Sequence, residues 1–99
     1  MIRITAKELR EAIEFLNAQS DEEIDYNEKH GFWSSNILRK TEEEFNCNVE
    51  KANMLLDLAS IAEYVGGLNT PELNTWLSEH PEVYLSKGAK EIVCPEGVD

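Results

Sequence analysis

The side chains with the most obvious chemical potential gather in one short stretch, residues 20–33, which holds five acids, one histidine and three aromatics. Four oxygen-bearing residues alternate there as the first ligands of a calcium-binding loop do: Asp21, Glu23, Asp25 and Asn27. Such a loop needs glycine at its sixth position and a bidentate glutamate at its twelfth, where this chain has Tyr26 and Phe32. The stretch therefore does not predict a calcium site, and we expect an acidic helix or loop instead.

The two cysteines and two histidines do not form a recognisable site either. Cys47, Cys94, His30 and His80 are far apart, without the close spacing of structural zinc ligands. The nucleophile, phosphate-loop and dinucleotide motifs of common enzymes do not occur. Acids in runs are usually water-exposed and lack the shifted pKa of a catalytic carboxylate. We expect two free thiols in a non-enzymatic protein without metal or cofactor.

Size and charge narrow the class of partner. The 99 residues suit a single compact domain, 1–99, and 20 acids against nine bases give a net charge of −11. This charge repels phosphate backbones and anionic membranes, but attracts basic protein surfaces. The sequence has no membrane-length apolar run, and the residues from Met1 to Ile4 lack the apolar stretch typical of a signal peptide. We expect a cytoplasmic monomer or homodimer that binds neither nucleic acid nor membrane directly.

Helix signals divide the first half of the chain. Ser or Thr is followed three residues later by Glu in three candidate capping boxes, which are Thr5 with Glu8, Ser20 with Glu23, and Thr41 with Glu44. An apolar stripe predicts a helix over about 6–18, and a shorter helix over about 21–29 would end at Gly31. Whether residues 35–40 form their own helix or extend the next one is open.

The second half predicts a central helix. Phe45, Val49, Ala52 and Leu56 recur at helical spacing, and beyond Leu55 the apolar arc covers most of the circumference. This helix should end at Gly66-Gly67, with a further helix from the Thr70-Pro71 N-terminal signal to about Glu79. Residues 2–4 and 91–94 have the β-branched content of short strands. The predicted fold is mainly α, a bundle of about four helices with a terminal two-stranded β-ribbon; α+β is the alternative.

Residues 60–77 resemble a helix-turn-helix unit, with Ala62 and Gly66 four residues apart, a short turn and a second helix. Gly67 lengthens the turn, and no base occurs from Ala52 to Ser86, whereas DNA readers place several there. A transcriptional regulator using residues 60–79 is therefore one alternative function, beside a small structural or assembly subunit.

The leading hypothesis is an acidic protein-binding module that covers a basic surface of a partner, including the phosphate site of a nucleic-acid-binding protein. Inhibitors and anti-host factors of phages or mobile elements have this character. Aromatic anchors bordered by charge are typical of protein interfaces. The alternative for Phe32 and Trp33 is a place in the core. The predicted contact residues are Glu14, Asp21, Glu22, Glu23, Asp25, Tyr26, Glu28, Phe32, Trp33, Glu42 and Glu43.

Overall fold

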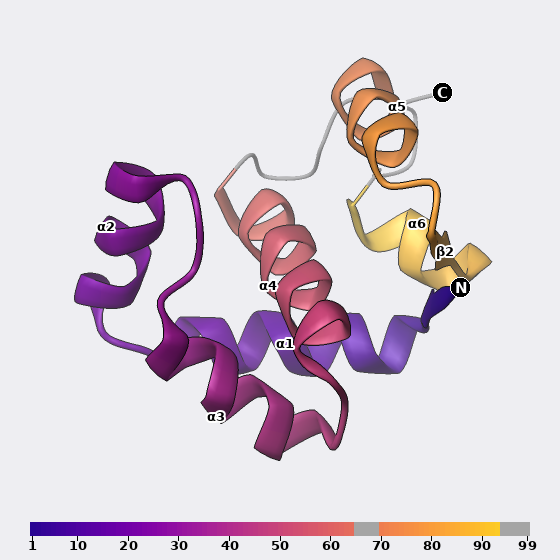
Figure 1. Ribbon diagram of the computed structural model, residues 1–99. Helices are drawn as coiled ribbons and strands as arrows, with labels where there is room; N and C mark the ends of the chain where they lie inside the picture. Colours follow the sequence, from indigo (N-terminus) through magenta and orange to yellow (C-terminus); the bar gives the residue numbers. More distant parts are fainter. Residues whose placement is uncertain (65–69, 94–99) are drawn as a thin grey trace.

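The computed structural model of the chain describes residues 1–64 and 70–93, and over these ranges it is mainly helical, as predicted (Figure 1). The described part contains six helices and two short strands rather than about four helices. In chain order the elements are β1 (Ile2–Ile4), α1 (Ala6–Asn17), α2 (Asp21–His30), α3 (Ser35–Phe45), α4 (Val49–Tyr64), α5 (Thr70–Glu79), β2 (Val83–Leu85) and α6 (Lys87–Val93).

Helix α1 forms as its sequence predicts. The Thr5 hydroxyl accepts from the Glu8 amide and the Glu8 carboxylate accepts from the Thr5 amide at 3.0 Å, so the capping box is complete. Leu9, Ala12 and Leu16 are buried along one side of the helix. The local signal and the amphipathic pattern agree here, which explains why the predicted bounds hold within a residue.

The capping box predicted at Thr41 is wrong, because Thr41 lies inside α3. Its side chain is fully buried and its hydroxyl donates to the Ile37 carbonyl at 2.7 Å. The side chain that caps α3 is Ser34, whose hydroxyl accepts from the Ile37 amide. The Glu44 side chain is exposed in the last turn of the same helix. The buried Thr41 hydroxyl thus finds its hydrogen-bond acceptor in the backbone of its own helix.

Helices α3 and α4 are separate elements, which answers the question that the sequence left open. Asn46 adopts a left-handed conformation with φ of 49° and ends α3. Asparagine tolerates this conformation better than most residues. Two residues later Asn48 begins the next helix, since its side-chain oxygen accepts from the Lys51 amide at 2.9 Å. The apolar spacing runs across this break and so conceals it in the sequence.

Helix α4 is the central helix. Its buried residues point in several directions around the axis, and it packs on α1, α3 and α6 (Figure 1). The fully buried positions on it are Ala52, Leu55, Leu56, Leu58 and Ala59. The predicted end at Gly66-Gly67 lies outside the described residues. The predicted end of the following helix at Glu79 is confirmed.

The short sheet pairs different segments from those predicted. β1 forms as expected, but it runs parallel to β2, with Ile2, Arg3 and Ile4 opposite Val83, Tyr84 and Leu85. The strand predicted over 91–94 is wrong: residues 91–93 belong to α6, and Cys94 lies outside the described residues. Val93 lies one helical turn from Ala89, and both are buried, so helical packing prevails over β propensity there.

Candidate partner-binding surface

Helix α2 is anchored lightly and faces outward. None of its ten described residues is buried, and among its apolar side chains Ile24 is the one that packs against the core. Acids occupy its first turn and Lys29 and His30 its last, which suits the helix dipole. Gly31 ends the helix in the left-handed conformation, with φ of 79°, as predicted. Almost the whole helix is thereby available for contact.

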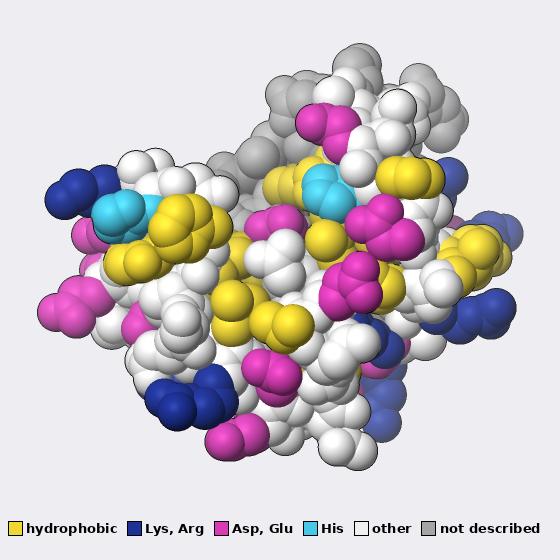
Figure 2. Space-filling view, viewed as in Figure 1, with side chains coloured by type: hydrophobic (Ala, Val, Ile, Leu, Met, Phe, Trp, Pro, Cys, Tyr) yellow, Lys and Arg dark blue, Asp and Glu magenta, His cyan; other side chains and the backbone are white. Residues whose placement is uncertain are grey.

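An exposed aromatic cluster, defined by Tyr26, His30 and Phe32, lies at the end of α2. The ring centroids of Tyr26 and His30 are 4.2 Å apart, and the Phe32 ring lies 5.8 Å from Tyr26 and 5.6 Å from His30. Tyr26 and His30 meet because they are one turn apart, and the turn at Gly31 brings Phe32 back beside them. Phe32 is 56% exposed and Tyr26 36%. Figure 2 shows this cluster as adjoining yellow and cyan side chains over α2.

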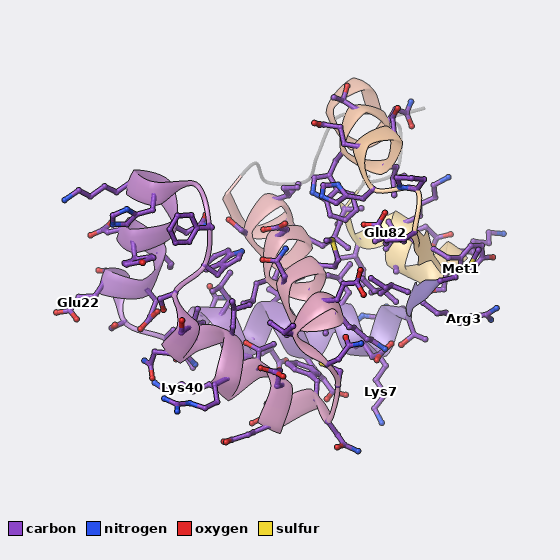
Figure 3. All side chains as sticks on the ribbon, viewed as in Figure 1. Met1, Arg3, Lys7, Glu22, Lys40 and Glu82 are labelled. Carbon is purple, nitrogen blue, oxygen red and sulfur yellow. The ribbon has the colours of Figure 1, made fainter. Side chains whose placement is uncertain are left out.

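The predicted acidic contact residues divide into two groups. Those on α2 are together: Asp21, Asp25 and Glu28 share one face of the helix, and Glu22 points outward beside them (Figure 3). Glu42 and Glu43 lie near the C-terminal end of α3, after Arg39 and Lys40. Glu14 is exposed on α1. The exposed acids on α2 are Asp21, Glu22, Asp25 and Glu28. At 100° per residue, the face of Asp21, Asp25 and Glu28 points in a different direction from Tyr26 and His30.

Glu23 serves the fold rather than the open surface. Ser20 occupies the N-cap position of α2 without a side-chain cap bond, so the second predicted capping box is wrong. Glu23 instead accepts hydrogen bonds from the Ser34 hydroxyl at 2.7 Å and the Asn36 amide at 3.1 Å. The bond from Ser34 lowers the pKa of Glu23 most, helped by Asn36 and the charge of Lys40 and opposed by partial burial. Glu23 therefore ties α2 to the start of α3.

Trp33 lies in the core, whereas its neighbour Phe32 lies on the surface. The Trp33 side chain is 3% exposed, and its indole N–H donates to Oδ1 of Asp57 on α4 at 2.7 Å. This bond joins the segment after α2 to the central helix. A buried ring cannot contact a partner directly, so we leave Trp33 out of the contact surface.

Nothing in the sequence singles out Asp57, which lies half-buried on α4. Burial raises the pKa of the Asp57 carboxyl, while the hydrogen bond from Trp33 and the charge of His80 oppose this rise. His80 follows α5, and its ring stacks on Trp76 with centroids 4.2 Å apart. A carboxyl that receives a tryptophan N–H and lies near a histidine thus links three segments of the chain.

Asp57→Asn is expected to remove a pH-dependent loss of stability. Because the folded state raises the pKa of Asp57 above its ordinary value of 3.8, the native protein holds this proton more tightly than the unfolded chain. The contribution to stability is complete below pH 3.8 and is lost as pH rises through the raised pKa. Asparagine keeps an oxygen for Trp33 but carries no charge. Urea unfolding of both proteins across this pH range should show the variant gaining stability relative to the wild type as pH rises; a constant difference would contradict the assignment.

The turn of the predicted helix-turn-helix unit lies outside the described residues. The second helix is present as α5, and its described exposed side chains include Asn74, Thr75, Ser78 and Glu79. None of these carries a positive charge. The DNA-binding alternative therefore remains a hypothesis with unfavourable electrostatics.

Two further observations concern sites of other kinds. In residues 1–64 and 70–93, no group of three or more His, Cys, Asp or Glu side chains is arranged to hold a metal ion. No helix in the same ranges combines the length and apolarity needed to cross a membrane.

Comparison with protein-family models, with curated proteins and with solved structures found no match to this chain.

Proposed function

We propose that the protein is a non-enzymatic acidic binding module that covers a basic surface of a partner protein with α2 and Phe32. The observation that carries this proposal is the exposed cluster of Tyr26, His30 and Phe32 on a helix that has no buried residue. Adjoining exposed rings form an apolar patch of the kind found where a partner binds. Helix α2 adds little to the core, so its exposed face is available to bind a partner.

The partner fits by charge and by ring chemistry. Asp21, Glu22, Asp25 and Glu28 are exposed on the same helix as Tyr26 and His30, and they attract arginine and lysine side chains. Arginine guanidinium groups also stack on aromatic faces, with about 0.5–1 kcal/mol at exposed sites. Carboxylates spaced along a helix can occupy sites that otherwise hold phosphates. A nucleic-acid-binding protein is the partner class that this combination suits best, and covering its phosphate site would inhibit it.

The charge part of the proposal is tested with a fluorescent oligo-arginine peptide as the probe. The variant Asp21→Asn/Glu22→Gln/Asp25→Asn should bind this peptide roughly tenfold more weakly, since three surface charges each contribute about 0.5 kcal/mol. The difference should shrink at high salt. The matched control is Glu50→Gln/Glu79→Gln/Glu91→Gln, which removes the same charge from exposed positions on other helices. Equal weakening by both variants would contradict a specific surface.

The aromatic part has a separate readout. Phe32→Ala and Tyr26→Ala should weaken binding of the peptide while leaving its salt dependence unchanged, because they remove stacking area and no charge. Unaltered affinity in both variants would exclude the rings from the surface. A specific complex with DNA in a low-salt mobility-shift titration would instead favour the alternative, a regulator that uses residues 60–79.

A further inference from the structure

A second surface lies along the outer edge of β1, at the end of the molecule away from α2. An open hollow of about 430 Å³ separates Met1, Ile2 and Arg3 from the turn between α3 and α4. Residues 46–48 and Lys51 form its other wall. Figure 3 shows Met1 and Arg3 at one end of the molecule and Glu22 at the other. The hollow is therefore distinct from the proposed surface on α2.

The backbone of β1 has a free side that borders this hollow. The Ile2 amide donates to the Glu82 carbonyl at 2.6 Å, and the Ile4 carbonyl accepts from the Ser86 amide at 3.0 Å. Peptide groups of alternate strand residues point to opposite edges, so the amide and carbonyl of Arg3 point away from β2. Within residues 1–64 and 70–93 these two groups have no hydrogen-bond partner. Such an edge can accept a further strand.

The charge of the hollow is opposite to that of the protein. Its lining includes Arg3 and Lys51 and no acid, although acids outnumber bases 20 to nine in the chain. The Arg3 guanidinium lies 5.3 Å from the centre of the ring of Tyr84, the residue opposite it on β2. Lys51 already pairs with Glu8 at 2.5 Å, so Arg3 supplies most of the free positive charge. The amide side chains of Asn46 and Asn48 add polar groups on the facing wall.

We propose that the outer edge of β1 binds an extended acidic segment of a partner protein by strand addition. The segment would hydrogen-bond to the amide and carbonyl of Arg3, and its carboxylates would lie against the Arg3 side chain. This surface selects a partner segment of the opposite charge to the one that α2 attracts. The inference does not rest on the function proposed for α2, because no residue of that helix lines the hollow.

The probe is a short peptide of alternating glutamate and valine, followed by amide NMR of the whole protein. We expect peptide-dependent shifts at Arg3, residues 46–48 and Lys51, and slower hydrogen exchange of the Arg3 amide. The same peptide with N-methylated backbone should not slow that exchange, because it cannot pair with the edge. A lysine–valine peptide should not bind. Shifts confined to α2, or no shifts, would overturn the proposal.

Charge reversal provides the matched variants. Arg3→Glu should weaken binding of the acidic peptide at least about tenfold. Lys90→Glu changes the net charge equally at an exposed position of α6 and should have little effect on that binding. Equal weakening would indicate attraction without a site and overturn the inference. Inorganic phosphate that reproduces the shifts without slowing Arg3 exchange would indicate an anion site only. Concentration-dependent shifts at Arg3 without peptide would make a second copy of the chain the occupant, and would equally overturn it.

Discussion

Replacing Trp33 with alanine is expected to lower the free energy of unfolding by about 3–5 kcal/mol, the usual cost of removing a buried aromatic side chain. The ring is 3% exposed, and its N–H is bonded to Asp57, so the change opens a cavity and leaves a carboxylate without its donor. A domain of this size has about 5–15 kcal/mol of stability in total. Urea unfolding followed by circular dichroism measures the loss.

Two companion variants separate packing from hydrogen bonding. Trp33→Phe keeps most of the ring and should cost about 1–3 kcal/mol, because the Asp57 oxygen loses its partner. Phe32→Ala, at the adjacent and 56% exposed position, should change stability by no more than about 0.5 kcal/mol. Similar losses at positions 32 and 33 would contradict the opposite placement of the two rings.

The second large effect concerns α4. Leu55→Ala, Leu56→Ala and Leu58→Ala should each cost about 2–5 kcal/mol, since all three side chains are fully buried. Residues 55 and 56 point about 100° apart on a helix of 3.6 residues per turn. An amphipathic helix at the surface would tolerate at least one of these changes. A helix enclosed by α1, α3 and α6 tolerates none of them.

Val49→Ala is the control on the same helix, because Val49 is 51% exposed at the first position of α4. Its expected effect is within about 0.5 kcal/mol. Thermal or urea unfolding of the four single variants gives the comparison. A small loss at Leu55 or Leu56 would show that one side of α4 is not enclosed.

The three capping boxes illustrate which predictions hold. Each pairs Ser or Thr with Glu at the same spacing, yet one box forms completely, at Thr5 and Glu8. At Ser20 the glutamate is taken by Ser34 and Asn36, and at Thr41 the side chain is buried within a helix. At Ser20 the local motif fails because more distant groups bind the same carboxylate. The competitors of Glu23 come from 11 and 13 residues away, beyond the reach of a local pattern.

The candidate surface on α2 was likewise predictable only in part from the sequence. The acids of α2 and the turn at Gly31 were predictable from composition and glycine placement. The separation of Phe32 from Trp33 was not, because both are aromatic and adjacent, and the choice depends on the acceptor that Asp57 offers from 24 residues away. The free edge of β1 was equally out of reach, since the partner strand lies some 80 residues further along the chain, at 83–85.

The sequence by itself determined the helical class, the bounds of α1 and α2, and the burial of α4, because helical periodicity, caps and apolar arcs act over a few residues. Tertiary structure decided which strand pairs with β1, that 91–93 is helical, that Glu23 and Trp33 serve the fold, and where positive charge gathers on an acidic protein. These outcomes depend on contacts between distant segments. Such contacts form between whole surfaces, and short stretches of sequence do not encode them.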